Sequence, residues 1–213
     1  MLPEIPITIL KCDLAAWPGW NIDDHLYDLP PLFQSEIERY RKLSDQKARL
    51  VARLMLRQCL KDTGAEHLLE TWKRDARNKP FIEGWYPFSI SHSGSVVLFA
   101  FGPSPVGIDI ERTSPVNYTE LSVHFHPIEL ATIHADAHPM ERFYDIWVKK
   151  EAVLKAVGIG AMADLSSFDC TGMTVEYEGK TWDFSRIDVH REYKCYLCAD
   201  PGARGVQVNE FRL

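Results

Sequence analysis

The segment VGIDIE, residues 106–111, places two carboxylates in a stretch that otherwise resembles a buried strand. Side chains of a strand alternate between its faces, so Asp109 and Glu111 are expected side by side on the face opposite the apolar residues. Neighbouring carboxylates repel each other and lose solvation unless water, a proton or a cation compensates them. This pair therefore requires a partner from elsewhere in the chain or from solution.

The segment FYDIWVKKEAVLKAVG, residues 143–158, contains the best candidate for a third carboxylate. Its apolar residues follow a helical period, and Glu151 and Lys155 are four residues apart, hence adjacent on the helix surface. One interpretation is an exposed ion pair, which contributes only about 0.3–0.5 kcal/mol. The other is an oxygen-rich site for magnesium made by Asp109, Glu111 and Glu151, with Lys150 and Lys155 beside it.

A third candidate is the sequence Ser91-His92-Ser93-Gly94, at the end of an expected strand. Serine and glycine favour turns, so these residues are typical of a hairpin. Their hydroxyls, amides and imidazole could instead bind phosphate oxygens. A hydrolase triad is disfavoured because the GxSxG nucleophile motif is missing, and no Walker-type phosphate loop is present.

Two basic segments could hold a multiply charged anion, although a solvated charged surface is the ordinary interpretation. One is a short turn before the hairpin, Arg77-Asn78-Lys79-Pro80. The other is a helical segment with five cations: Arg39, Arg41, Lys42, Arg49 and Arg53.

Composition limits the protein class. The chain has 213 residues, of which 46% are hydrophobic and 25% charged, as expected for one large globular domain or two small lobes. A formal net charge of −6 disfavours general nucleic-acid binding but permits a local basic pocket. No targeting segment and no run of roughly 18 apolar residues is visible, so we expect a cytoplasmic protein without membrane contact. The odd number of cysteines, five, predicts reduced thiols.

The pattern of elements predicts an α+β fold. One or two amphipathic helices are expected within residues 34–60, and another over residues 139–157. Two strands joined at Ser93-Gly94-Ser95, followed by the VGIDIE strand, predict an antiparallel meander. Further strands are expected near residues 173–178, 181–189 and 193–199.

Taken in order, four motifs resemble the Sfp-type 4′-phosphopantetheinyl transferases. They are NKP at residues 78–80, FSISHSG at 88–94, VGIDIE at 106–111, and WVKKEAVLKAVGIG at 147–160, which contains the W-x-x-KEA pattern. The resemblance covers nearly the whole chain and is clearest over residues 77–168. Each motif alone is weak, whereas their order and spacing together are specific.

The resemblance implies transfer of the phosphopantetheine group of coenzyme A to a serine of an apo acyl, peptidyl or polyketide carrier protein, with release of 3′,5′-ADP. It implies Mg²⁺ held by Asp109, Glu111 and Glu151, and Glu151 as the base for the carrier serine. Lys155 would neutralise the pyrophosphate. The residues that it implies for coenzyme A binding are Arg49, Lys79, Ser91, His92, Lys150 and Lys155.

The resemblance also implies a pseudodimer of two similar α+β halves, each with a mainly antiparallel sheet and a long helix. The halves are expected at residues 1–105 and 106–213, with the active site in the cleft between them and a monomer as the functional unit. Asn78 stands where family members often have glycine. Asparagine tolerates left-handed backbone angles better than most residues, so the turn is expected to persist.

Other functions stay open at this point. The same acidic trio would suit another magnesium-dependent phosphoester or nucleotide enzyme, and a noncatalytic binder of coenzyme A or carrier protein is a third possibility. The histidine-rich segment HFHPIELATIHADAH suggests zinc because His134 and His138 have helical spacing. Pro127 and Pro139 interrupt that segment, which disfavours a metal site there.

Overall fold

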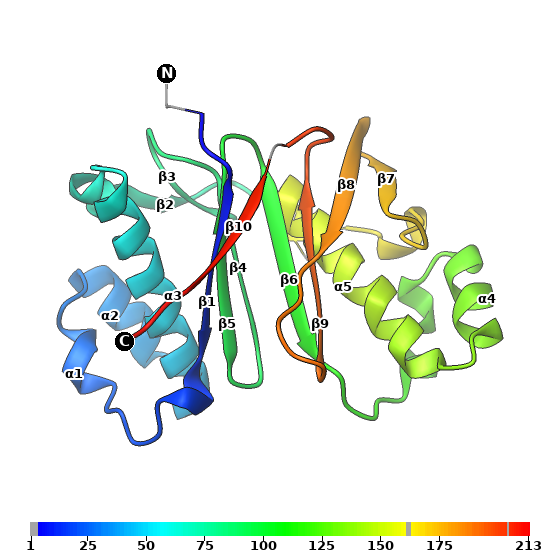
Figure 1. Ribbon diagram of the computed structural model, residues 1–213, viewed down its shortest axis with the longest axis horizontal. Helices are drawn as coiled ribbons and strands as arrows, with labels where there is room; N and C mark the ends of the chain where they lie inside the picture. Colours follow the sequence, from blue (N-terminus) through cyan, green and yellow to red (C-terminus); the bar gives the residue numbers. More distant parts are fainter. Residues whose placement is uncertain (1–3, 161–162, 204) are drawn as a thin grey trace.

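A computed structural model describes residues 4–160, 163–203 and 205–213. Two four-stranded sheets occupy the middle of the molecule, and groups of helices lie at either end (Figure 1). The mixed α+β architecture with two halves is confirmed. The predicted division at residues 105 and 106 stays a prediction, and the final strand of the chain returns to the first sheet.

The first half combines one sheet, a small two-stranded ribbon and three helices. Its sheet has the order β10-β1-β5-β4, in which only the β1–β10 pair is parallel. The strands are β1 (Ile7–Asp13), β4 (Phe88–Ser93), β5 (Val96–Phe101) and β10 (Val206–Glu210), and the ribbon is β2 (Trp72–Arg74) with β3 (Pro80–Ile82). The helices are α1 (Asp23–Leu26), α2 (Pro31–Glu38) and α3 (Leu43–Asp62), with short 3-10 turns η1 (Leu14–Ala16) and η2 (Glu66–Thr71).

The second half has an antiparallel sheet of order β6-β9-β8-β7. Its strands are β6 (Val106–Arg112), β7 (Thr174–Tyr177), β8 (Lys180–Arg186) and β9 (Tyr193–Ala199). The helices are α4 (Pro127–Ala135) and α5 (Pro139–Val157), with 3-10 turns η3 (Tyr118–His124) and η5 (Leu165–Ser167). The predicted helix over 139–157 is confirmed. It begins at a proline, whose missing N–H costs nothing in the first turn, and ends at Gly158 in the left-handed region (φ 84°).

The two long helices bury apolar faces against the sheets. Helix α3 contributes Leu50, Val51, Met55, Leu56 and Leu60 to the first core, and each is fully buried. Residues at such helical spacing occupy one stripe, and burial of one such side chain stabilises the fold by about 1.5–3 kcal/mol. Strands β4 and β5 add the stacked rings of Phe88 and Phe99 to the same core.

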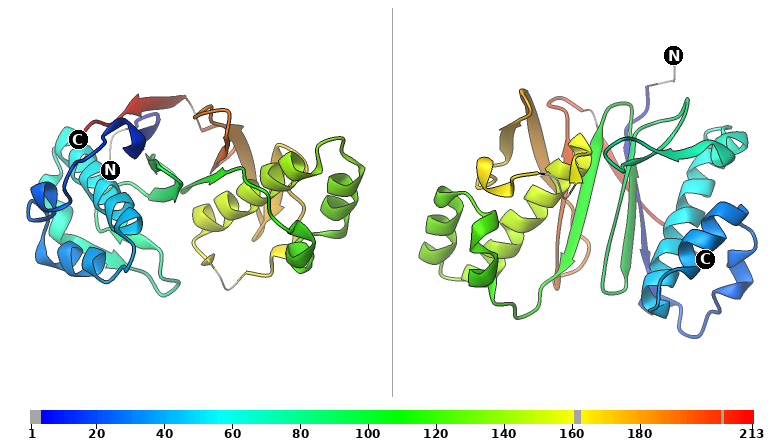
Figure 2. Two further views of the ribbon diagram at one scale, coloured as in Figure 1. Left: turned by 90° about the horizontal axis from the view of Figure 1, so that it is seen from below. Right: turned by 180° about the vertical axis from the view of Figure 1, so that it is seen from behind.

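The prediction of an antiparallel meander is wrong for its third strand. The β4–β5 hairpin forms as expected, with Gly94 at φ 57° in the turn, but β6 pairs with β9 and opens the second sheet. Strands β4 and β6 nevertheless lie side by side (Figure 2), joined through side chains. The turn at residues 102–105 fixes where β6 starts. The strand with which β6 pairs, β9, lies nearly 90 positions later in the chain, so the local sequence does not reveal it.

Helix α5 crosses β6 at very short range. A Cβ atom added to Gly107 would lie 1.9 Å from Ala152 O and 2.4 Å from Ala156 N. Only glycine allows the helix backbone to approach the strand this closely. The close approach matters for the site, because Asp109 is two residues further along β6 and Glu151 precedes Ala152.

Among the residues that the structure describes, none of the helices combines the length and the apolar character needed to cross a bilayer.

We expect Gly107→Ala to lower the free energy of unfolding by about 3 kcal/mol, because the new methyl group must displace the backbone of α5. Urea denaturation monitored by circular dichroism measures this. Gly172→Ala is the matched control, since a Cβ there would meet nothing closer than 3.5 Å, and its change should stay within about 1 kcal/mol. Equal stability of the two variants would contradict the packing described here.

Candidate active site

A cavity of about 430 Å³ lies between the two halves. Its walls come from five elements: α3, the β2–β3 ribbon, β4, β6 and α5. The lining residues are Arg49, Ala52, Arg53, Arg74, Pro80, Ile90, Ser91, His92, Asp109, Glu111, Trp147, Glu151 and Lys155. Seven of the nine site residues predicted from the sequence therefore share one cavity.

The three predicted carboxylates reach this cavity from β6 and α5. Alternation along β6 sends Ile108 and Ile110 into the core and leaves Asp109 and Glu111 on the other side. On α5 the cavity residues are Trp147, Glu151 and Lys155, spaced by four and therefore one stripe of the helix. The close packing of α5 on β6 then brings the strand and helix carboxylates to one place.

The charges of these carboxylates affect one another. Burial raises the pKa of Glu151, and the charges of Asp109 and Glu111 raise it further, while Lys155 opposes them. Burial also raises the pKa of Glu111, with a further contribution from Asp109, against the hydrogen bond from Ser93. The ionised trio is thus electrostatically unfavourable in the absence of a cation.

Asp109 is the most buried of the three carboxylates, and only one of its two oxygens accepts hydrogen bonds from described residues. Its side chain Oδ1 accepts a hydrogen bond from Lys155 Nζ at 2.6 Å and another from Ser91 Oγ at 2.8 Å. Its Oδ2 is buried and has no hydrogen-bond partner within the described part of the chain. A buried carboxylate oxygen without a partner is costly, and a bound cation would satisfy it.

The donor set fits a hard divalent cation in its chemistry. Carboxylate oxygens are the ligands that magnesium prefers, and Asp109 Oδ2 has no hydrogen-bond partner among the described residues. Within residues 4–160, 163–203 and 205–213, no group of three or more acidic, histidine or cysteine side chains already has a geometry that could hold a metal ion. Side-chain adjustment of Glu111 and Glu151, both only partly buried, would be needed to close such a site.

Cations line the opposite wall of the cavity, on α3 and β2. The guanidinium of Arg49 stacks on the Tyr40 ring at 3.7 Å, and its Nε is buried without a hydrogen-bond partner among the described residues. Arg53 donates to Glu36 at 3.2 Å, and burial lowers its pKa to about 10. With Arg74, these arginines also line an adjoining polar hollow of about 470 Å³. The arrangement favours an anionic ligand that extends from the carboxylates toward α3.

His92 of β4 also lines the cavity. Burial lowers the pKa of its imidazole, and the nearby charges of Arg49 and Lys155 lower it further. A neutral imidazole keeps one nitrogen as a donor and one as an acceptor, which suits hydrogen bonding to a phosphate oxygen.

Lys79 is placed differently from the prediction of a direct phosphate contact. Its Nζ donates to the carbonyl oxygens of Lys155 at 2.7 Å and Ala156 at 2.9 Å, so it caps the C-terminal end of α5 from the other half. Burial lowers the pKa of Lys79 to about 8. Its side chain borders a second cavity of about 460 Å³, on the far side of Lys155. The preceding turn contains Asn78 in the left-handed region at φ 66°, as expected for a residue that replaces glycine.

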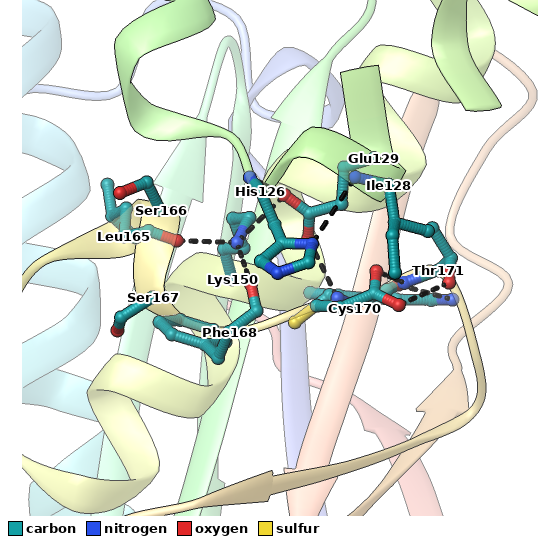
Figure 3. Close-up of polar contacts among 12 residues, drawn as sticks. His126, Ile128, Glu129, Lys150, Leu165, Ser166, Ser167, Phe168, Cys170 and Thr171 are labelled. Carbon is teal, nitrogen blue, oxygen red and sulfur yellow. Dashed lines mark hydrogen bonds and ion pairs between the residues drawn. The ribbon is translucent and has the colours of Figure 1, made fainter. Parts of the chain in front are cut away.

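Lys150 does not reach the cavity, which corrects the sequence-based assignment. Its side chain is fully buried and forms an ion pair with Glu129 at 2.9 Å (Figure 3). Its Nζ also donates to Leu165 O and Phe168 O, both at 2.6 Å. On a helix, residues 150 and 151 point about 100° apart, so Glu151 faces the cavity and Lys150 faces the second core. Lys150 thereby anchors the segment after α5.

Neither the cysteines nor the histidine-rich segment forms a second site in the described residues. All five cysteines are buried and free, and burial raises the pKa of every thiol. No described group of histidines has metal-binding geometry. His126 instead caps α4, where its Nδ1 accepts from Ile128 N at 3.3 Å.

Several cavity residues were not identified from the sequence as site residues: Ala52, Arg74, Pro80, Ile90 and Trp147. Arg53, one of the five cations named in the basic helical segment, does line the cavity, because it lies four residues after Arg49 and therefore on the same helix face. The position of Arg74 could not be found in this way, since it depends on the β2–β3 ribbon packing beside α3.

We expect Glu151→Gln to raise the melting temperature of the metal-free protein by about 2–4 °C at pH 7.5, which corresponds to roughly 1 kcal/mol for a chain of this size. A carboxylate with a raised pKa holds its proton longer in the folded state, so stability falls as the pH rises above its ordinary value. The uncharged amide of the Glu151→Gln variant does not ionise, so the variant keeps the stability that the wild type loses as the pH rises. The gain should shrink as the pH is lowered toward 4.

Scanning calorimetry across this pH range measures the difference. Glu141→Gln is the matched control, on the first turn of the same helix and exposed, where its weak pair with Lys194 at 3.3 Å contributes little. A Glu151→Gln variant no more stable than the wild type at pH 7.5 would show that the trio is not electrostatically unfavourable.

Two protein-family models and several curated proteins match this chain. The model of the 4′-phosphopantetheinyl transferase superfamily matches residues 105–198, and that of the 4′-phosphopantetheinyl transferase N-terminal domain matches residues 22–104. The 4′-phosphopantetheinyl transferase gsp of Aneurinibacillus migulanus is 31% identical over 177 residues, which cover 78% of this chain and 74% of the relative.

Two other relatives are more distant or aligned over a shorter part. A 4′-phosphopantetheinyl transferase of Bacillus subtilis is 34% identical over 133 residues, 57% of this chain and 59% of the relative. The L-aminoadipate-semialdehyde dehydrogenase-phosphopantetheinyl transferase of Rattus norvegicus is 26% identical over 222 residues, 85% of this chain and 71% of the relative. These matches confirm the family resemblance drawn from the motifs. The chain belongs to the 4′-phosphopantetheinyl transferases, enzymes that transfer the phosphopantetheine group of coenzyme A to carrier proteins.

Proposed function

We propose that this chain carries out phosphopantetheinyl transfer in the cavity between its two halves. The observation that carries the proposal is the meeting of Asp109, Glu111, Glu151 and Lys155 in one cavity whose opposite wall is basic. A diphosphate ester needs both parts: a metal and cations for the phosphate charge, and a base beside the reacting phosphorus. The gsp relative supports the same reaction by its name.

The metal of this site would be Mg²⁺, held by Asp109, Glu111 and Glu151. Bound there, it would neutralise charge on the pyrophosphate oxygens and help to align them. Asp109 Oδ2 would be the first ligand, since it is buried without a hydrogen-bond partner among the described residues. Binding would also relieve the mutual repulsion that raises the pKa of Glu111 and Glu151.

Glu151 would act as the general base. The hydroxyl oxygen of the carrier serine attacks the phosphorus that bears the pantetheine arm, and the bond from that phosphorus to the oxygen of 3′,5′-ADP breaks. The serine proton passes to the Glu151 carboxylate, directly or through a water molecule. Glu151 lines the cavity beside Asp109 and Glu111, and an ionised carboxylate placed at the reacting group can accept this proton.

The basic wall would bind the nucleotide part of coenzyme A. Lys155 is the cation closest to the carboxylates and would neutralise the pyrophosphate. Arg49 and His92 would contact phosphate oxygens, and Arg53 and Arg74 extend the same basic surface. Lys79 would act through α5, whose last carbonyls it caps.

The partners would be an apo carrier protein and coenzyme A, with no nucleic acid and no membrane. Residues of α3 and β4 from the first half and of β6 and α5 from the second half line the same cavity, so one chain supplies the whole lining and a monomer suffices. Five free thiols suit a reducing compartment, in agreement with the cytoplasm.

We expect wild-type protein with coenzyme A and Mg²⁺ to increase the mass of an apo carrier protein by one phosphopantetheine group. Asp109→Ala and Glu151→Gln should each lower the rate at least ~100-fold, because they remove a metal ligand and a proton acceptor. Mass spectrometry of a panel of carriers measures both. Glu141→Gln, outside the cavity, should transfer at the wild-type rate.

Two outcomes would point to other functions. Hydrolysis of coenzyme A without a change in carrier mass would indicate a magnesium-dependent phosphoester hydrolase. Binding of coenzyme A or carrier without turnover across the panel would indicate a noncatalytic binder. Full activity of Asp109→Ala with an intact circular dichroism spectrum would remove Asp109 from the reaction.

We expect Lys155→Ala to lower kcat/KM for coenzyme A by about 10- to 100-fold, since a hydrogen bond to a charged group is worth about 1.5–3 kcal/mol. Steady-state kinetics with saturating carrier protein measure this. Lys61→Ala, an exposed lysine near the end of α3 and outside the cavity, is the control. Unchanged coenzyme A kinetics in Lys155→Ala would show that this lysine does not contact the pyrophosphate.

A further inference from the structure

Three serines of β4 connect the two halves through their side chains. Ser89, Ser91 and Ser93 alternate along the strand and therefore share one face. Their Oγ atoms accept hydrogen bonds from the backbone N–H groups of β6, at 3.0 Å from Ile108, 3.3 Å from Ile110 and 3.0 Å from Arg112. No backbone ladder pairs β4 with β6 in the described sheets. Serine hydroxyls take the place of that ladder.

Two of these hydroxyls also hold a carboxylate of the proposed metal site. Ser91 Oγ donates to Asp109 Oδ1 and Ser93 Oγ donates to Glu111 Oε2, each at 2.8 Å. Each serine thus connects a carboxylate with the N–H of the residue that follows it on β6. The repeat comes from the matching two-residue periods of the neighbouring strands.

The third serine lacks this second contact. The β6 residue that corresponds to Asp109 and Glu111 in its register is Gly107, which has no side chain. Ser89 is as buried as Ser91, at 5% exposure each. Ser89 is therefore an internal control. It shares the inter-strand hydrogen bond with Ser91 and Ser93 and the burial with Ser91, but it has no carboxylate contact.

Ser91 is fully engaged. Besides its bond to Asp109 and the N–H of Ile110, its Oγ accepts a hydrogen bond from Lys155 Nζ at 2.9 Å. A hydroxyl has one proton and two lone pairs, so these three bonds use its whole capacity. The hydroxyl rotor is fixed, and Asp109 Oδ1 is held between Ser91 and Lys155 while Oδ2 stays open.

We propose that Ser91 and Ser93 are positioning residues that orient Asp109 and Glu111 for the metal, whereas Ser89 serves only the contact between the halves. This inference rests on the proposed function, because it assumes that the carboxylates bind a divalent cation. Ligand carboxylates held by hydrogen bonds lose less rotamer freedom on metal binding, and loss of such a supporting contact typically weakens metal affinity by about 10- to 100-fold.

The test is Mn²⁺ binding to full-length protein without a carrier, so that no turnover occurs. Titration followed by the electron paramagnetic resonance of free Mn²⁺, with and without saturating coenzyme A, gives the affinity. We expect Ser91→Ala and Ser93→Ala each to bind Mn²⁺ about 10-fold more weakly or worse, and Ser89→Ala to bind as the wild type does. Ser93→Thr, which keeps the hydroxyl, should recover most of the affinity.

Melting temperatures of the same variants separate orientation from stability. All three alanine variants should melt a few degrees below the wild type, because each loses an inter-strand hydrogen bond. A loss of Mn²⁺ affinity in Ser89→Ala equal to that in Ser93→Ala would overturn the inference, since stability alone would then explain it. Wild-type affinity in both Ser91→Ala and Ser93→Ala would also overturn it.

The inference and the proposed function fail in different ways. If wild-type protein binds no Mn²⁺ even with coenzyme A, the metal site itself is wrong and the inference falls with it. If wild-type protein binds Mn²⁺ and Ser91→Ala loses only affinity for metal-free coenzyme A, Ser91 contacts the nucleotide instead. That result overturns the positioning role of Ser91 and leaves the metal site intact.

Discussion

The close packing of α5 across β6 at Gly107 is the constraint on which the rest of the site depends. Strand carboxylates and helix carboxylate come from segments 40 residues apart in the chain, and they share a cavity because the helix backbone touches the strand backbone. A larger residue at position 107 would separate them. The local geometry of each element then decides which side chains face the cavity: the strand period selects Asp109 and Glu111, and the helix period selects Glu151 and Lys155.

Charge in this site is balanced against folding stability. Burial and mutual repulsion raise the pKa of Glu111 and Glu151, so the empty trio is unfavourable at neutral pH. Lys155 and the two serine hydroxyls offset part of that cost by holding Asp109 and Glu111. A divalent cation would offset the rest. Such local conflict between stability and chemistry is expected where a protein binds a charged ligand.

Three lysines that the sequence assigned to the coenzyme A site have three different environments in the structure. Lys155 borders the cavity and pairs with Asp109, Lys79 caps the end of α5 from the opposite half, and Lys150 is sealed in the second core with Glu129. Lys79 and Lys150 support the helix that carries Glu151, one at its end and the other through the segment that follows it. Of these three lysines, Lys155 is placed to contact a ligand, whereas Lys79 and Lys150 stabilise the position of α5.

The sequence by itself determined the elements and the faces they present: the helix over 139–157, the β4–β5 hairpin, the left-handed turn at Asn78, and the shared face of Asp109 and Glu111. Those features follow from residue types and periods within a few positions. Only the tertiary structure decided that β6 opens a second sheet, that β10 returns to the first, and that Lys150 is buried. Strand partners and the depth of a long, flexible side chain depend on contacts between residues far apart in the chain, and local periodicity carries no information about them.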